Sequence, residues 1–175
     1  PLGLKKWFER RKIHRILELD WWEEHRMEKI KATCTPSQHW SKRTPFDGNQ
    51  SLWSSWVLKI EDFNFFFAGD TGYNPYQFRE IGEKLGPFDL SAIPIGAYEP
   101  RWFMKNYHVN PEEAVQIHLD IASKLSVGIH HTTFQLADEP WDAPTLSLKE
   151  AVKSCCIPED AFLTVPIGRT IKISL

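Results

Sequence analysis

The sequence lacks a long apolar run, a dominant sign of charge and a cysteine framework. No stretch among its 175 residues is apolar over the roughly 20 positions that a membrane span requires, and its first residues are charged, so we expect no signal peptide. Lys and Arg (21) nearly balance Asp and Glu (23), which gives no reason to expect nucleic-acid binding. Cys34, Cys155 and Cys156 show neither metal-type spacing nor disulfide pairing, which is typical of reduced thiols in an intracellular protein.

The length and the 42% content of hydrophobic residues suit one domain with a real core. Strand-like runs, hairpins and a few helical patterns alternate along the chain, without internal repeats, which predicts an α+β fold. Eight tryptophans are a high number, and Trp40, Trp102 and Trp141 lie in polar, loop-like surroundings. An indole ring there can line a pocket or lie at a lipid interface.

One stretch organises the chain. From Asn64 a run of aromatic residues leads into Ala-Gly-Asp-Thr-Gly and ends at Tyr73. A short apolar run bounded by glycine predicts a buried strand, with Asp70 on the turn at its exit. Two interpretations of Asp70 remain open at this point. The carboxylate could bind a metal ion, or it could cap the helix predicted over Pro75–Leu85.

The remaining pattern predicts strands and helices around this stretch. A basic amphipathic helix is expected over Leu4–Ile16, where it either packs as a surface helix or contacts an anionic membrane. A further helix begins after Asn110 as N-cap, with Pro111 in its first turn, and another is expected over Leu148–Ser154. Strands are predicted over Ile16–Trp22, Ile30–Thr35, Leu52–Ile60, Leu90–Ile95, Ser126–Ile129, Phe162–Val165 and Thr170–Ile173.

Three predicted strands end at a side chain that can bind a metal ion. His39 follows the strand over Ile30–Thr35, Asp70 follows the aromatic strand, and His130 follows the strand over Ser126–Ile129. Imidazole and carboxylate together suit Zn²⁺ or a comparable divalent ion, and a carboxylate can bridge two ions. The alternative is that each histidine is a structural residue held by hydrogen bonds.

Several long blocks of the sequence resemble one enzyme family, N-acyl-phosphatidylethanolamine-hydrolysing phospholipase D of the metallo-β-lactamase fold superfamily. The resemblance covers most of 2–134 and weakens beyond Gln135. It is carried by the blocks Thr-Pro-Ser-Gln-His-Trp (35–40), Phe-Phe-Ala-Gly-Asp-Thr-Gly-Tyr (66–73), Ile-Pro-Ile-Gly-Ala-Tyr-Glu-Pro-Arg-Trp-Phe-Met (93–104), His-Val-Asn-Pro-Glu-Glu-Ala (108–114) and Ile-His (129–130).

The resemblance implies an αββα sandwich and a di-zinc hydrolase. It implies that His39 binds one zinc ion, that Asp70 bridges both and that His130 binds the other. The implied catalytic pair is Asp70 with His108, and the implied products are an N-acylethanolamine and phosphatidic acid. Substrate contacts are implied for Tyr98, Arg101, Trp102 and His108.

The sequence departs from the family in one respect that bears on activity. The superfamily signature His-x-His-x-Asp-His is absent, so four of the seven expected ligands are missing. We therefore expect residues 1–175 to be the C-terminal portion of one domain, inactive alone. His131 stands where the family has a bulky aromatic, and His130 holds the ligand position. Tyr107 also stands where the family commonly has a different polar residue, and its presence bears on the shape of the site.

Three functions remain open. The first is a phospholipase D acting on N-acylated ethanolamine phospholipids, an intracellular enzyme attached peripherally to membranes through residues 5–15 and exposed tryptophans. The second is a non-catalytic truncated isoform that binds lipid or a partner. The third is a related lactonase-type hydrolase, against which the Glu-Pro-Arg-Trp block at 99–102 argues. A homodimer is a further expectation.

Overall fold

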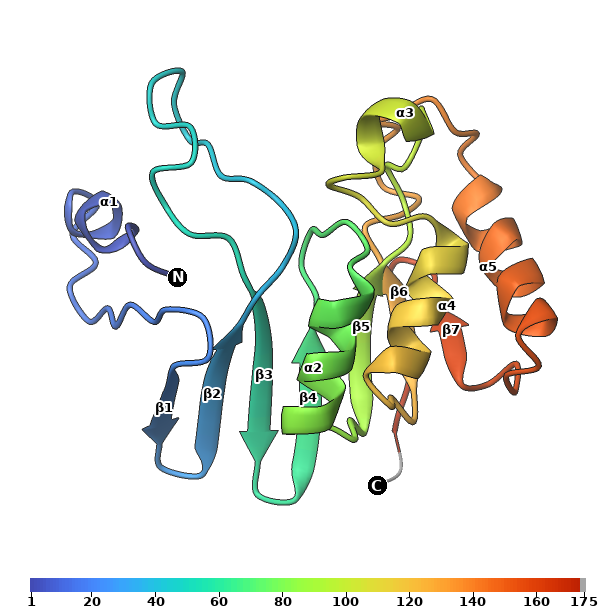
Figure 1. The fold of residues 1–175 in the computed structure, drawn as a ribbon, viewed down its shortest axis with the longest axis horizontal. Helices are drawn as coiled ribbons and strands as arrows, with labels where there is room; N and C mark the ends of the chain where they lie inside the picture. The colour runs from blue at the N-terminus through green and yellow to red at the C-terminus, as the bar shows by residue number, and fades with distance from the viewer. Residues whose placement is uncertain (174–175) are drawn as a thin grey trace.

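A computed structural model describes residues 1–173 and contains a mixed sheet whose strands lie in chain order (Figure 1). Strands β1 to β4 are antiparallel neighbours, and β4 to β7 are parallel neighbours. The strands are β1 (Glu24–Met27), β2 (Ile30–Thr35), β3 (Ser55–Ile60), β4 (Phe63–Phe67), β5 (Leu90–Pro94), β6 (Ser126–Ile129) and β7 (Phe162–Thr164).

Helices cover one face of this sheet. Figure 1 shows α2 and α4 crossing in front of the strands, with α5 beside α4. Asn74 and Asn110 cap α2 and α4 with their side chains, and each helix begins with proline, whose missing N–H needs no partner there. The helices are α1 (Lys5–Glu9), α2 (Pro75–Leu85), α3 (Arg101–Met104), α4 (Pro111–Asp120) and α5 (Ala143–Ser154).

The core lies between the helices and the sheet. Phe66 of β4 and Ile93 of β5 are fully buried there, because alternate residues of a strand point to the same face. They belong to one apolar cluster with helix residues of α2, α4 and α5. Those residues are Phe78, Ile81, Ala114, Val115, Ile117, Leu148, Ala151 and Val152.

The opposite face of the sheet is also apolar but only half-buried. The register places Trp56, Phe67 and Ala92 in one row across three strands, and Leu58 beside Phe65 in the next. Phe67 keeps 38% of its surface exposed, although it lies in the middle of the sheet. The α+β class predicted from the sequence is confirmed. Residues 1–173 supply one sheet and one helical layer of a sandwich.

Most predicted elements are present, one is shorter than predicted and two do not form. β2, α2 and β6 match their predicted bounds. The helix predicted over Leu4–Ile16 is wrong in length, since only Lys5–Glu9 is helical. Beyond Arg10 the residues are mostly charged and Ile13 remains exposed, so a longer helix would have no apolar face to bury.

The strand predicted over Ile16–Trp22 is wrong, because residues 16–20 pair with no strand of the sheet and Trp22 turns the chain with a left-handed φ of 71°. The strand over Thr170–Ile173 does not form either, and these residues lie outside the sheet. β1 and α3 were not predicted.

The topology brings several loops to one edge of the sheet. Because β4, β5 and β6 are parallel and β2 runs in the same direction, all four strands end at that edge, which we call the site edge. The loops 36–54, 68–74, 95–110 and 130–142 meet there, at the top of Figure 1. Among residues 1–173, no helix has the length and apolar character needed to cross a bilayer.

Candidate metal centre

Asp70 and His130 contact each other directly at the site edge. Asp70 Oδ1 lies 2.7 Å from His130 Nδ1, and both side chains remain nearly half-exposed. Gly69 has a left-handed φ of 64°, which allows the sharp turn after β4 that presents the carboxylate. The alternative interpretation of Asp70 as a helix cap is wrong, because Asn74 accepts the capping hydrogen bond from the Gln77 N–H.

The electrostatics of this cluster favour an ionised carboxylate. The hydrogen bond from His130 lowers the pKa of Asp70, and the charges of His130, His108 and His39 act in the same direction. Burial lowers the pKa of His108, so that this imidazole favours its neutral form. The site edge therefore holds one carboxylate among three imidazoles.

His39 presents a nitrogen that has no hydrogen-bond partner among residues 1–173. Its Nδ1 lies 2.9 Å from the carbonyl oxygen of Trp40, and its Nε2 is buried without a hydrogen bond. If Nδ1 donates to that carbonyl, Nε2 carries the lone pair, which is how a histidine is oriented for a metal ion. The His39 ring also lies edge-on to the His108 ring, with centroids 5.2 Å apart.

Asp70 lies between two cavities of the surface. His39 lines the first cavity together with Asp70, and His108 and His130 line the second together with the same Asp70. The donor types therefore fit divalent ions on either side of a shared carboxylate. Their number does not complete a site, because no three His, Cys, Asp or Glu side chains within residues 1–173 are grouped closely enough to hold an ion.

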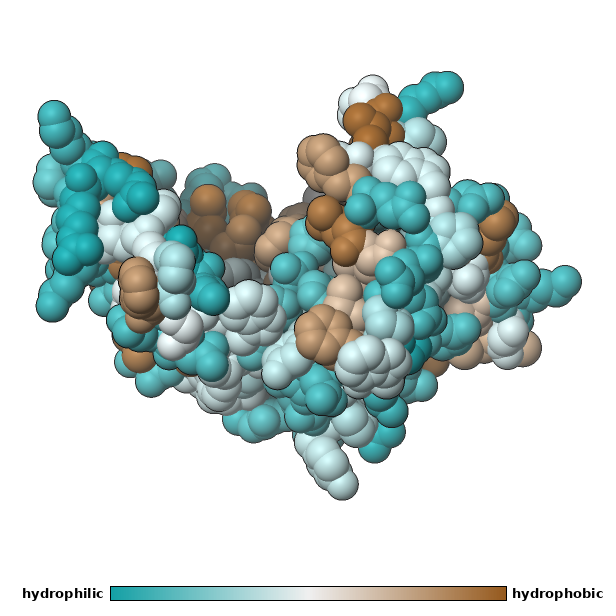
Figure 2. Space-filling view, turned by 90° about the horizontal axis from the view of Figure 1, so that it is seen from above, coloured by the Kyte–Doolittle hydropathy of each residue, from teal (hydrophilic) through white to brown (hydrophobic). Residues whose placement is uncertain are grey.

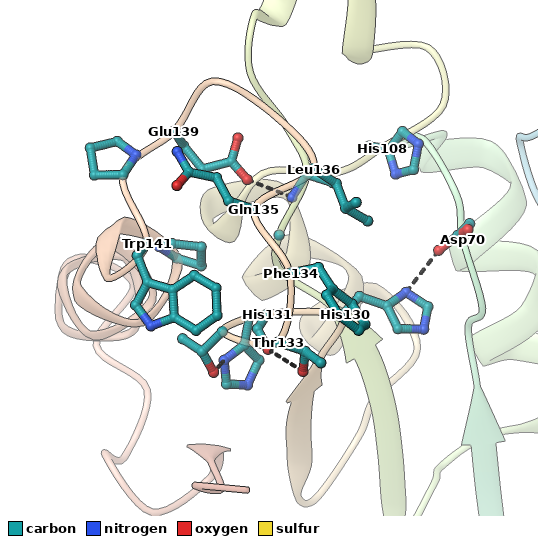
Figure 3. A pocket seen from close by; sticks show the side chains of 15 residues that line it. Asp70, His108, His130, His131, Thr133, Phe134, Gln135, Leu136, Glu139 and Trp141 are labelled. Carbon is teal, nitrogen blue, oxygen red and sulfur yellow. Dashed lines mark hydrogen bonds and ion pairs between the residues drawn. The ribbon is translucent and has the colours of Figure 1, made fainter.

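The second cavity is an apolar pocket of about 440 Å³ beside His130. Its wall is the segment after β6, and Figure 3 shows Phe134 beside His130 and Leu136 between Phe134 and His108. Trp141 lies on the far side of the same pocket. The arrangement places two imidazoles and a carboxylate at one end of an apolar cavity, where they can contact the polar end of a ligand with an apolar tail.

Glu139 connects the pocket wall formed by the segment after β6 to the loop after β5. The sequence did not predict this role. The Glu139 side chain is buried, and its carboxylate accepts a hydrogen bond from the N–H group of Ala97 (2.6 Å), which Figure 3 shows, and another from the N–H group of Glu99 (3.0 Å). Ala97 has a left-handed φ of 60°, which these bonds help to hold. No local signal distinguishes Glu139 from its exposed neighbour Asp138, because the partners lie 40 and 42 residues away.

The residues expected to contact substrate are dispersed. His108 lines the pocket, whereas Tyr98 is buried and Trp102 projects into solvent with 84% of its surface exposed. Arg101 binds inward, since its guanidinium donates to the His108 carbonyl oxygen (2.8 Å) and to Glu113 (2.7 Å). Substrate contact by Tyr98, Arg101 and Trp102 stays a prediction.

The two adjacent histidines have different environments. Both ring nitrogens of His131 have neighbours within the chain, Nε2 at 3.2 Å from the Gly128 carbonyl oxygen and Nδ1 at 3.0 Å from the Thr132 hydroxyl. Burial lowers the pKa of His131. His130 is the histidine that faces Asp70, and its role as a metal ligand stays a prediction.

Comparison with known proteins decides the family. Residues 3–131 match the model of the β-lactamase superfamily domain. The chain belongs to the metallo-β-lactamase superfamily. It is 44% identical, over 96% of its length, to a Caenorhabditis elegans protein named N-acyl-phosphatidylethanolamine-hydrolyzing phospholipase D 1, and covers 50% of that protein. It is 36% identical, over 85% of its length, to the yeast mitochondrial protein of that name, and covers 33% of it.

Solved structures of low sequence identity share the fold. The metallo hydrolase Igni18 of Ignicoccus hospitalis aligns with a TM-score of 0.71 at 18% identity, over 97% of this chain and 66% of that protein. The diiron β-hydroxylase CmlA of Streptomyces venezuelae gives the same TM-score at 17% identity, over 98% of this chain and 37% of CmlA. The chain thus spans half or less of the two named curated relatives.

Proposed function

We propose that this chain forms one half of a metal-dependent phosphodiesterase that hydrolyses N-acyl-phosphatidylethanolamine to an N-acylethanolamine and phosphatidic acid. One observation carries the proposal. Asp70 is shared by two cavities, with His39 on one side and His130 on the other, and the second cavity is an apolar pocket. The 44% identity to a protein named for this reaction supports the choice of substrate.

The proposal gives each side chain a defined task. His39 would bind one divalent ion, Asp70 both ions and His130 the other, and a pair of ions so held lowers the pKa of a water and stabilises phosphoryl oxygens. His108 lies beside the carboxylate, where its imidazole can contact the phosphate of the substrate. The pocket walls exclude water from an acyl chain, and Glu139 holds that wall in place.

Because residues 1–173 hold no complete group of metal ligands, we expect the 175-residue chain alone to release no N-acylethanolamine from micellar substrate. The coding region upstream of Pro1 should contain the His-x-His-x-Asp-His motif, and the longer product should hydrolyse the lipid in the presence of zinc. Zinc-dependent turnover by the 175-residue chain would show that its own ligands suffice. A start codon at or near Pro1 would favour a non-catalytic module, which the incomplete ligand set also supports.

The bridging role is tested by Asp70→Asn in the longer product. The amide keeps the size of the side chain and removes the charge that two cations require, so turnover should be lost at every metal concentration. Asp62→Asn is the matched control, because Asp62 is exposed in the turn between β3 and β4 at the opposite edge. Metal content should be measured for zinc and iron, since the fold also occurs in a diiron protein. Activity retained by Asp70→Asn would refute the bridging role.

A further inference from the structure

His108 belongs to a loop at the surface of the site edge. The residues before it, Lys105, Asn106 and Tyr107, are all exposed. The helix before this loop, α3, lies at one border of a hollow that Figure 2 shows from the site edge, opposite the end that carries α1. Exposed side chains pack against few neighbours, so packing gives the loop little rigidity. A defined position of the His108 imidazole therefore depends on hydrogen bonds.

Three hydrogen bonds hold the backbone at His108. The His108 N–H donates to the Met104 carbonyl oxygen (2.9 Å), and the Val109 N–H donates to the carbonyl oxygen of Thr71 in the turn after β4 (2.9 Å). The third bond comes from a side chain, since the Arg101 guanidinium donates through Nη1 to the His108 carbonyl oxygen (2.8 Å). Of these three bonds, the one from Arg101 is the one that a substitution can remove without changing the backbone.

Glu113 holds the other terminal nitrogen of Arg101. Arg101 Nη2 lies 2.7 Å from Glu113 Oε2, and the two side chains are only 24% and 19% exposed. The same Oε2 accepts the N–H of Asn110 (3.1 Å) as part of the capping box of α4. The residues that follow in α4, Ala114 and Val115, are fully buried in the core. Arg101 therefore connects the His108 loop to a helix that is anchored against the sheet.

These contacts leave Arg101 poorly placed to bind a substrate. Its Nη1 has the carbonyl oxygens of His108 and Tyr98 as acceptors, and its Nη2 has Glu113. A phosphate would need the same N–H groups, because arginine binds phosphate through its planar fork. Of the two side chains, His108 lines the apolar pocket, whereas Arg101 lies behind the loop that carries it. Arg101 is thus suited to act on His108 and not on the substrate itself.

We propose that Arg101, held by Glu113, is a positioning residue that keeps the His108 imidazole in place beside Asp70. The proposal rests on the proposed function, in which this imidazole contacts the phosphate of the substrate. The His108 ring also lies edge-on to the His39 ring, with centroids 5.2 Å apart, so a shift of its backbone changes its place among the site residues. A displacement of about 1 Å at a reacting group can cost about a hundredfold in rate.

The first test follows the loop by NMR in the 175-residue chain and does not depend on hydrolysis. Arg101→Gln should lower the backbone order parameters of His108 and Val109 from about 0.85 to below about 0.6, and the Val109 amide should exchange with solvent about tenfold faster. The control is Arg79→Gln, which removes a guanidinium that pairs with Asp120 between α2 and α4. Either change confined to Arg101→Gln supports the proposal, and equal values in both variants overturn it.

The second test separates kcat from KM in the longer product that contains the His-x-His-x-Asp-His motif. Arg101→Gln should lower kcat about a hundredfold and leave KM within about threefold, because the contacts that bind the substrate are kept. Glu113→Gln keeps an acceptor oxygen for the cap of α4 and weakens the bond to Arg101, so it should lower kcat less. Added to Arg101→Gln, it should change kcat no further, since its partner is already gone.

Two kinetic results have a different meaning. If Arg101→Gln raises KM at unchanged kcat and Glu113→Gln behaves as the unsubstituted protein, Arg101 contacts the substrate and the positioning role is refuted. If the unsubstituted longer product hydrolyses no N-acylated phospholipid, the proposed function fails. The order parameters and the exchange of the Val109 amide then still decide whether Arg101 holds the His108 loop.

Discussion

Glu139→Gln should destabilise the fold and loosen the wall of the pocket. Glu139 is 9% exposed, and its carboxylate accepts two backbone hydrogen bonds, from Ala97 at 2.6 Å and from Glu99 at 3.0 Å. Glutamine keeps the size of the side chain and one acceptor oxygen. Its NH₂ group would face the second backbone N–H, and two donors cannot satisfy each other.

The magnitude follows from these two contacts. A hydrogen bond to a charged group contributes about 1.5–3 kcal/mol, and a buried N–H left without a partner costs about 1–3 kcal/mol. One bond of Glu139 becomes neutral and weaker in the variant, and the other is lost. We therefore expect the free energy of unfolding to fall by about 2–3 kcal/mol, out of the roughly 5–15 kcal/mol that a domain of this size has.

Urea unfolding followed by tryptophan fluorescence measures this change, with Asp138→Asn as the control. Asp138 precedes Glu139, is exposed and contributes only its backbone N–H to the neighbouring loop. Hydrogen exchange adds a local measure, because the amides of Ala97 and Glu99 should lose protection in Glu139→Gln alone. A loss below about 0.5 kcal/mol, equal to that of the control, would refute the view that this carboxylate holds the wall.

Three other changes have expected outcomes. Burial lowers the pKa of His118, so as the pH falls below about 6.5 the unfolded chain binds a proton that the folded chain does not. The free energy of unfolding, measured in urea, should therefore fall by up to about 1.4 kcal/mol from pH 7.5 to 5.5. His118→Gln should remove that part of the pH dependence. Gly72→Ala places a methyl group 2.5 Å from the Asn106 carbonyl oxygen, and should cost about 1–3 kcal/mol by thermal unfolding, whereas an unchanged melting temperature would contradict the contact. Asp70→Asn should change stability by less than about 1 kcal/mol, because its pair with His130 is nearly half-exposed, and a larger loss in urea would indicate a structural carboxylate.

The prediction of strands and helices succeeded where a local pattern has one structural solution. The aromatic run before Gly69 forms β4, since a short run of aromatic residues that ends at glycine favours an extended strand, and Asn110 followed by Pro111 begins α4 with a capping box. The pattern failed over Leu4–Ile16 and Ile16–Trp22. The structure supplies these segments with neither an apolar surface nor a strand partner along their length, and periodicity alone does not reveal that.

The candidate site likewise contains residues that the sequence could predict and contacts that it could not. His39, Asp70 and His130 could be selected from the sequence, because each follows a strand and has the chemistry of a metal ligand. The inward contacts of Arg101 could not, since the His108 carbonyl oxygen and Glu113 lie 7 and 12 residues away and compete with any substrate for the same donors. Sequence position does not decide which acceptor an arginine meets.

The sequence by itself determined that an ionisable side chain stands at the end of each of three strands, because strand patterns and turn residues are local properties. Only the tertiary structure decided that these ends share one edge, since the parallel order of β4, β5 and β6 depends on crossovers through α2 and α4. It also decided that Asp70 faces His130 while Glu139 holds the pocket wall, because both contacts join residues that lie 40 or more positions apart.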